Sequence, residues 1–147
     1  MILTQETKME SISFPAKGEN ITIVERLIDE LCEKNNIHEE HYGNILIALT
    51  EAANNAIYHG NKQDPEKTVK VDYSADEDRF FFRIEDEGPG FDYENVPDPT
   101  SPENLEKPNG RGVFLMRHLS DDLEFKDGGR IVEIEFKDLS KPIEVSA

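Results

Sequence analysis

The sequence predicts an α+β fold, a two-layer α/β sandwich in which helices cover one face of a mixed, mostly antiparallel sheet. Two segments with the helical spacing of apolar residues lie together in the first half of the chain, and hairpin patterns follow them. Helices and strands that are grouped in this way, rather than alternating, are typical of α+β domains. The length of 147 residues suits one domain spanning 1–147, with a core at about residues 9–137.

Composition and charge narrow the class of protein. The formal net charge of −16 repels phosphate backbones, so we expect no nucleic-acid partner. The longest apolar run, residues 45–49, is too short to span a membrane, and no signal peptide is recognisable. Cys32 is the single cysteine and lies among apolar residues. It predicts a core thiol in a reducing compartment, and therefore a cytoplasmic protein.

The first half of the chain predicts one strand and two helices. Residues 9–14 alternate loosely and are closed by a proline, which predicts an edge strand. Asn20 is the expected N-cap of a helix that ends near residues 35–36. A second helix begins around residues 38–42 and ends at Gly60, its expected C-terminal cap. The apolar stripes of the two helices are Ile21, Val24, Leu27, Ile28 and Leu31, and Ile45, Leu49, Ala52 and Ala56.

The second half predicts two hairpins. Residues 68–74 and 79–85 alternate on either side of an acidic turn. In the second of these strands Phe80, Phe82 and Ile84 are expected on one face and Phe81 on the other. Residues 123–126 and 130–136 enclose a second turn at residues 127–129.

The connection between the hairpins is long and rich in proline. Residues 92–110 contain little apolar material, and a connection of this length inside a domain is usually functional. We therefore expect a flexible lid at about residues 92–112, followed by a short helix at residues 113–119. The tail, residues 137–147, is expected to be frayed.

Three polar side chains share one face of the second predicted helix. Glu51, Asn55 and His59 stand at i, i+4 and i+8. A carboxylate and an amide on one face suit a base and a ligand for a hard cation beside a cleft. A solvated face is the alternative that this spacing alone leaves open.

Two glycine motifs follow. Asp86-x-Gly88-x-Gly90 stands at the end of a predicted strand, where the glycines allow close approach of a ligand and Asp86 offers an acceptor. Gly110-x-Gly112 precedes a predicted helix start, where amides bind phosphate oxygens. Taken alone, the first motif is also compatible with a tight acidic turn, and the second is weak evidence. Neither a Walker P-loop nor a Rossmann glycine motif is present, so any nucleotide site must be of another kind.

The three motifs in this order resemble the N, G1 and G2 boxes of the Bergerat-fold ATPases. The N box corresponds to Glu51-x-x-x-Asn55-Ala56-x-x-His59-Gly60, and the glycine motifs correspond to the G1 and G2 boxes. That superfamily includes DNA gyrase, sensor histidine kinases and anti-sigma-factor serine kinases. The resemblance covers roughly residues 18–136.

Among these families the chain is most similar to the bacterial anti-sigma-factor serine/threonine kinases. Gyrase-like members are larger and carry transducer domains. Sensor kinases need a helical domain with a phospho-accepting His, and their N box tends to carry Asn where this chain has Glu51. A short chain with Glu four residues before the Asn resembles the serine kinases.

The resemblance implies ATP and Mg²⁺ as cofactors and gives each motif a role. Asn55 would be a ligand of Mg²⁺. Glu51 would be the general base for a Ser or Thr hydroxyl of the target; its alternative role is to orient a water bound to the Mg²⁺. Asp86 would accept a hydrogen bond from the adenine amino group. The remaining expected nucleotide contacts are Gly88, Gly90, Gly110, Arg111 and Gly112.

Two assignments stay open. Arg111 either adds a positive charge at the phosphates or is a solvated side chain. His59 either contacts nucleotide or complements the dipole at the helix end. The family often has Thr after the Gly of the last hairpin, near adenine, whereas Gly129 is followed here by Arg130 and Ile131. Either the alignment with the family shifts by one residue here or that hydrogen bond is lost, which puts the affinity for nucleotide and the selectivity for the base in question.

The partners implied by the resemblance are an anti-anti-sigma protein, which is the target of phosphorylation, and a sigma factor. A homodimer is also implied. Two other hypotheses compete with the kinase: a non-catalytic module in which nucleotide only controls partner choice, and a detached catalytic domain of a histidine kinase.

Overall fold

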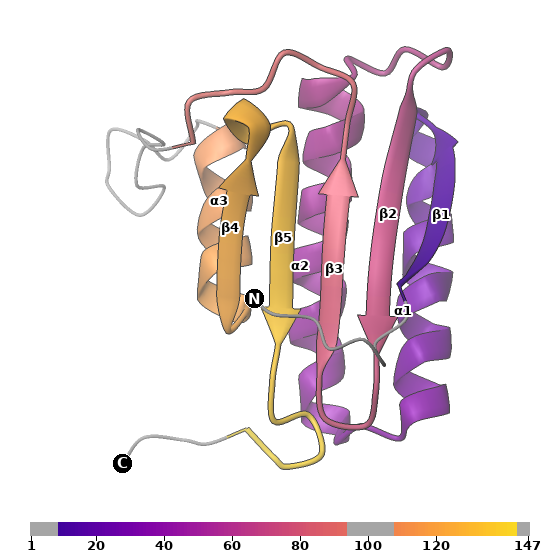
Figure 1. Cartoon of the computed structure of the whole chain (residues 1–147), viewed down its shortest axis with the longest axis vertical. Helices are drawn as coiled ribbons and strands as arrows, with labels where there is room; N and C mark the ends of the chain where they lie inside the picture. Colours follow the sequence, from indigo (N-terminus) through magenta and orange to yellow (C-terminus); the bar gives the residue numbers. More distant parts are fainter. Residues whose placement is uncertain (1–8, 94–107, 144–147) are drawn as a thin grey trace.

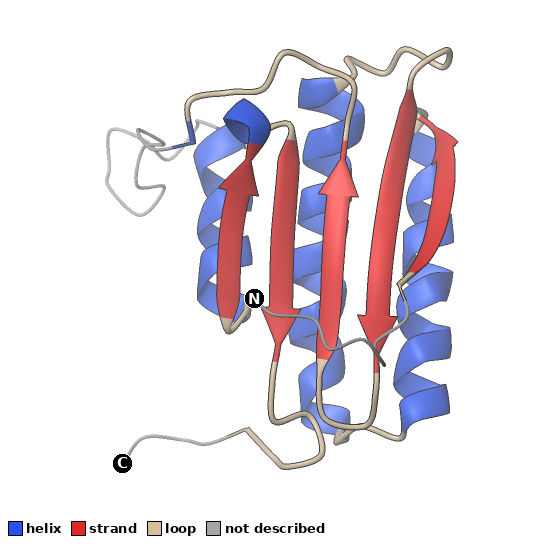
Figure 2. Ribbon diagram, viewed as in Figure 1, coloured by secondary structure: helices blue, strands red, loops and turns tan. Residues whose placement is uncertain are grey.

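The computed structural model describes residues 9–93 and 108–143 and has two layers. Helices α1 (Ile21–Asn35), α2 (Tyr42–Asn54) and α3 (Pro108–Leu119) cover one face of a five-stranded sheet, with α2 between the other two (Figures 1 and 2). The predicted α+β sandwich is confirmed. No helix within the described ranges has both the length and the apolarity that a membrane crossing requires.

The sheet has the strand order β1-β2-β3-β5-β4. Every pairing among these strands is antiparallel, so the parallel pair that a mixed sheet would contain is not found in the described part of the chain. The connections explain this. Two helices between β1 and β2 return the chain to the end where β1 finished, and β5 inserts between β3 and β4. The strands are β1 (Glu10–Pro15), β2 (Thr68–Ala75), β3 (Phe80–Glu85), β4 (Asp122–Lys126) and β5 (Ile131–Phe136).

The core lies between the sheet and the helices. Phe80, Phe82 and Ile84 project from β3 into it and are almost fully buried, as their alternation predicted. The Phe82 ring packs edge-on against Phe136 at 6.3 Å between centroids. Full burial of such a side chain contributes about 2 kcal/mol. The predicted stripe of α2 is also buried.

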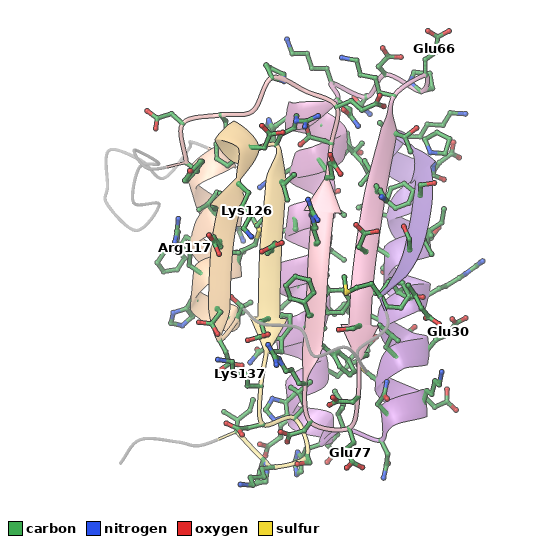
Figure 3. All side chains as sticks on the ribbon, in the orientation of Figure 1. Glu30, Glu66, Glu77, Arg117, Lys126 and Lys137 are labelled. Atoms are coloured by element: carbon green, nitrogen blue, oxygen red, sulfur yellow. The ribbon has the colours of Figure 1, made fainter. Side chains whose placement is uncertain are left out.

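The other face of the sheet is covered by no helix of the described chain, and it carries opposite charges on neighbouring strands. Lys126 Nζ lies 2.8 Å from Glu133 Oε1, and Lys137 Nζ lies 2.7 Å from Asp122 Oδ2 (Figure 3). Phe81 points to this face, as predicted, and is buried. We call it the open face.

Helix α1 begins directly after Asn20, which occupies the predicted N-cap position. The side chain of Asn20 makes no capping hydrogen bond; its Nδ2 donates to the carbonyl of Pro15 at 2.8 Å and ties the helix start to β1. The helix ends as expected, at Asn36, which is left-handed with φ 50°. Cys32 is half-buried against the core, and burial raises the pKa of its thiol to about 11, which leaves it protonated and unreactive at neutral pH.

Helix α2 continues as a wider, π-helical turn over Asn55–Gly60. The N–H of Asn61 donates to the carbonyl of Ala56 at 2.9 Å, five residues back. Gly60 is not left-handed, so the expected glycine cap is wrong; its small size serves another purpose, described below. Single π-helical turns are frequent at functional sites.

The segment after β5 is ordered as far as Ile143, contrary to the expected frayed tail. Leu139 is 1% exposed in the core, and its carbonyl accepts from His38 N at 2.7 Å. Ile143 N donates to Glu40 Oε2 at 2.9 Å. The sequence did not indicate this order, because a single apolar residue, Leu139, followed mainly by polar residues forms no periodic pattern. The final residues, 144–147, lie outside the described chain.

Candidate functional site

A cavity opens at the end of the sheet where β3 finishes. It encloses about 70 Å³, which is less than the 300–1,000 Å³ of typical small-molecule pockets. Of the predicted site residues, Asn55, Asp86 and Gly90 line it, and His59 lies at the same wall. The remaining walls are mainly apolar and include Ala52, Ala56, Ile84, Phe91, Val113, Met116, Phe125 and Val132.

Asp86 is a buried carboxylate in this cavity. It directly follows β3, is 8% exposed, and accepts a hydrogen bond on Oδ1 from Gly88 N at 2.7 Å. Burial raises the pKa of Asp86 above its usual range, although the Gly88 N–H and the positive charge of Arg130 act in the opposite direction. No described residue donates to Oδ2. The group is therefore desolvated and only partly compensated.

Gly60 and Gly88 are needed because the chain passes close to itself here. A Cβ on Gly60 would lie 2.3 Å from the carboxyl carbon of Asp86, and a Cβ on Gly88 would lie 2.1 Å from the carbonyl oxygen of Gly60. Gly90 has φ 84° and equally little room. The end of the N box thus locks against the G1 motif, and the two motifs form one structural unit.

Asn61 holds this unit together and was missed by the sequence analysis. It is fully buried; its Nδ2 donates to Thr68 O at 3.0 Å, and its Oδ1 accepts from Glu87 N at 2.7 Å. It therefore connects the π-helical turn to β2 and to the G1 motif. Asn61 stands at the start of a segment that the sequence predicts to be a polar loop, so its burial was not expected. Its position directly after Gly60, at the end of the N box, was the one available signal.

Glu51 and Asn55 meet helix α3 beside the cavity. A Cβ on Gly112 would lie 3.1 Å from Glu51 Oε2 and 3.2 Å from Asn55 Nδ2. The absence of a side chain at Gly112 therefore allows α3 to lie against both polar groups. Glu51 is half-buried and stands outside the cavity wall, whereas His59, one turn beyond Asn55, is exposed.

Helix α3 begins at Pro108, five residues before the predicted start. Gly110 and Arg111 consequently lie in its first turn, where N–H groups lack partners within the helix, and Arg111 is exposed. Gly112 lies beyond these first four residues, so it contributes close packing rather than a free amide. Most of the expected lid, residues 94–107, lies outside the described chain.

Arg130 lines the cavity. Its Nε donates to Asp127 Oδ2 at 2.9 Å, and its Nη2 lies 3.7 Å from Glu85 Oε1. Its carbonyl accepts from Asp86 N at 3.1 Å, which fixes the end of β3. Arg130 therefore offers a guanidinium at the cavity.

No group of three or more His, Cys, Asp or Glu side chains in the described chain could form a metal cage. Mg²⁺ does not require one, because it keeps several waters and binds through one or two side chains together with phosphates. The neighbouring oxygens of Asn55 and Glu51 fit that mode of binding.

The layered fold and the convergence of three motifs at one end of the sheet define an ATPase domain of the histidine-kinase type. Residues 14–136 match the histidine kinase-like ATPase domain family, and the chain belongs to that family.

Similar proteins narrow the class further. The chain is 26% identical over 119 residues to proteins named Serine-protein kinase RsbW from Bacillus cereus (strain AH187) and Bacillus thuringiensis subsp. konkukian (strain 97-27). Each alignment covers 77% of this chain and 74% of the relative. The crystal structure of the RsbU and RsbW domains of Rv1364c from Mycobacterium tuberculosis has the same fold, with a TM-score of 0.62 and 16% identity. The match covers 96% of this chain, which spans about a third (35%) of that longer one.

Proposed function

We propose that this protein is a serine/threonine protein kinase that uses ATP and Mg²⁺ to phosphorylate an anti-anti-sigma protein. The observation that carries the proposal is the meeting of Glu51 and Asn55 at Gly112, beside a cavity that holds the desolvated Asp86. Membership of the ATPase family and the similarity to proteins named serine-protein kinase support it.

The cavity would receive the adenine base. Asp86 would accept a hydrogen bond from the adenine amino group, and Gly88 and Gly90 would allow the base to approach the backbone. The cavity of about 70 Å³ is smaller than typical small-molecule pockets, so we expect its walls to separate on binding. Phe91, which is 39% exposed, and Arg130 line the cavity, and displacement of these two side chains would widen it.

The phosphates would extend from the cavity toward the start of α3. Asn55 would hold Mg²⁺ through its side-chain oxygen; when bound, the ion would neutralise phosphate charge in the field of this acidic protein. The amides of the first turn of α3, including Gly110, and the side chain of Arg111 would meet the phosphate oxygens. Gly112 would keep that turn close to Asn55.

Glu51 would act as the general base. It lies one helical turn before Asn55, so a hydroxyl approaching the γ-phosphate near Asn55 would pass its carboxylate. Glu51 would take the hydroxyl proton while the hydroxyl oxygen bonds to the γ-phosphorus and the bond to the β–γ bridging oxygen of ADP breaks. The products are ADP and a phosphorylated Ser or Thr.

Further elements of the proposal come from family resemblance. A sigma factor would be the second partner, the protein would act as a homodimer, and it would work in the cytoplasm.

Paired measurements on Glu51→Gln and Asn55→Ala test this function. We expect Glu51→Gln to keep its affinity for ATP while acid-stable phosphate transfer falls at least about 100-fold. Asn55→Ala should lose the Mg²⁺-dependent part of ATP binding in calorimetry. Glu30→Gln, on the exposed surface of α1, is the matched control and should match the wild type. Undiminished transfer by Glu51→Gln would remove Glu51 from the reaction.

A further inference from the structure

The outward face of helix α2 is unusually poor in charge. In a protein of which 33% of residues are charged, α2 carries no Asp, Lys or Arg and only one Glu, Glu51. The neighbouring helix α1 is the contrast. Its charged residues are Glu25, Arg26, Asp29, Glu30, Glu33 and Lys34, and Glu30 lies at the outer edge of the helical layer in Figure 3.

Four uncharged residues that are not buried form a continuous stripe along the outward face of α2. Gly43, Ile47, Thr50 and Asn54 stand at i, i+4, i+7 and i+11, and we call them the α2 stripe. Ile47 is 44% exposed at its centre. Glu51 follows Thr50 directly and lies one turn beyond Ile47, so the stripe leads to the proposed base.

Gly43 gives a second, independent indication. A Cβ built on it would meet no atom within 4 Å, and its φ is not positive. Neither lack of space nor backbone conformation within this chain therefore requires glycine. Glycine is also among the poorest residues for a helix. Close approach of another chain at this exposed position would explain it.

Helix α3 extends this surface and supplies its charge. Arg111, Phe114 and His118 stand at i, i+3 and i+7, opposite the buried Val113 and Met116. Phe114 is 38% exposed, and its ring stacks on His118 at 5.7 Å between centroids. The sequence of α3 contains two Arg and no Asp or Glu. Arg117 lies over the Phe125 ring of β4, whereas the exposed Arg111 gives the outward face of α3 a positive charge, which favours an acidic partner.

We propose that the α2 stripe and the outward face of α3 form the docking surface for the protein substrate. The occupant would present an apolar surface with an acidic rim and bring its hydroxyl to Glu51. Continuity of the surface with Glu51, which follows Thr50 directly, assigns the occupant as the substrate rather than a second copy of this chain. This inference rests on the proposed function.

The test uses Ile47→Gln with Met9→Gln as its matched control. Met9, beside β1 in the sheet layer, is similarly exposed at 37%. The probe is the anti-anti-sigma protein of the same organism, with Mg²⁺ and ATP. We expect Ile47→Gln to raise KM for the probe roughly tenfold, with the affinity for ATP unchanged, and Met9→Gln to match the wild type.

Gly43→Gln separates docking from folding. A residue of high helix propensity in open space should raise Tm by about 2 °C, while its side chain should weaken binding of the probe. A protein that becomes more stable and yet binds less well cannot owe the loss to unfolding. Equal KM values for the wild type, Ile47→Gln and Gly43→Gln would overturn the proposal.

Failure of the kinase function would be visible separately. If the wild type transfers no phosphate, calorimetric binding of the same probe decides: weaker binding by Ile47→Gln supports the surface, and equal binding overturns it. If the wild type does not bind the probe at all, the assignment of this partner to the surface is overturned. A wild-type dimer that becomes a monomer in Ile47→Gln, measured by sedimentation, assigns the stripe to a second copy of the chain and also overturns the proposal.

Discussion

Asp86 and Glu135 are the two buried acidic side chains of the described chain, 8% and 5% exposed, and their surroundings differ. Glu135 lies on the open face, where Arg79 Nε donates to its Oε2 at 2.6 Å and Lys137 Nζ lies 3.5 Å from its Oε1. Asp86 lies in the cavity and accepts one hydrogen bond, from Gly88 N.

The difference indicates which carboxylate serves the fold and which serves a ligand. A buried charge is costly unless it is paired and hydrogen-bonded. Arg79 and Lys137 compensate Glu135, whereas burial raises the pKa of Asp86 because its compensation is partial. A ligand that donates a hydrogen bond to Asp86 would complete the compensation of this buried carboxylate. The four predictions below test this contrast, beginning with the largest expected change in stability.

Gly88→Ala should disrupt the surroundings of Asp86 most strongly. The added Cβ would meet backbone, 2.1 Å from Gly60 O, and backbone cannot turn aside as a side chain can. We expect the free energy of unfolding to fall by about 3 kcal/mol and nucleotide binding to be lost. Urea denaturation measures the first and calorimetry the second. Gly43→Ala, with open space around its Cβ, is the control and should lose no stability.

Arg79→Ala should affect the fold alone. It removes the main partner of Glu135 and leaves a buried carboxylate with Lys137 only. Because Arg79 is 38% exposed, we expect a loss of about 2 kcal/mol, less than for a fully buried pair. The dissociation constant for ATP should not change. A loss of ATP affinity without a loss of stability would reverse the roles assigned to the two carboxylates.

Asp86→Asn should have the opposite effect to Arg79→Ala: stability is kept and ATP binding is lost. The amide retains an oxygen for Gly88 N and removes a charge whose burial is unfavourable, so Tm at pH 7 should stay equal or rise. Binding of ATP should be lost, because the amide also presents N–H groups to the adenine amino group. Glu135→Gln is the matched change on the open face and should lower Tm while ATP still binds. Thermal denaturation and calorimetry on both variants are sufficient.

The change in the free energy of unfolding with pH should be the smallest of the four effects, and the direction of the pKa shift fixes its sign. The pKa of Asp86 is raised in the fold above the ordinary value of 3.8, so the folded state binds this proton more tightly than the unfolded state. The contribution of Asp86 to the free energy of unfolding is therefore fully present below pH 3.8 and falls as pH rises through the raised pKa. The free energy of unfolding of the wild type minus that of Asp86→Asn, measured by urea denaturation from about pH 3.5 to 7, should decrease as pH rises. A difference that increases with pH would mean that Asp86 is well compensated.

The strands and helix stripes could be predicted because their signals are local. Alternation in β3 placed Phe80 and Phe82 on the core face and Phe81 on the other, and the stripe from Ile45 to Ala56 is buried as expected. The start of α3 was predicted too late. Pro108 and Gly110 have low helix propensity, so the sequence pattern did not indicate that the helix includes them.

The candidate site was predictable as a set of motifs but not as an arrangement. The spacing of Glu51 and Asn55 placed them on one face, and the chain brings both to Gly112. The burial of Asn61 and the position of Arg130 beside Asp86 depend on contacts between distant segments, which leave no periodic trace in the sequence.

The sequence by itself determined the α+β class, the order of the elements and the three motifs, because side-chain periodicity and glycine placement act over a few residues. Tertiary structure alone decided the π-helical turn at Asn55–Gly60, the lock between Gly60 and Gly88, and the burial of Asp86. The physical reason is that desolvation and steric exclusion depend on which distant segments fill the space around a group. That space exists only once the helices have packed against the sheet.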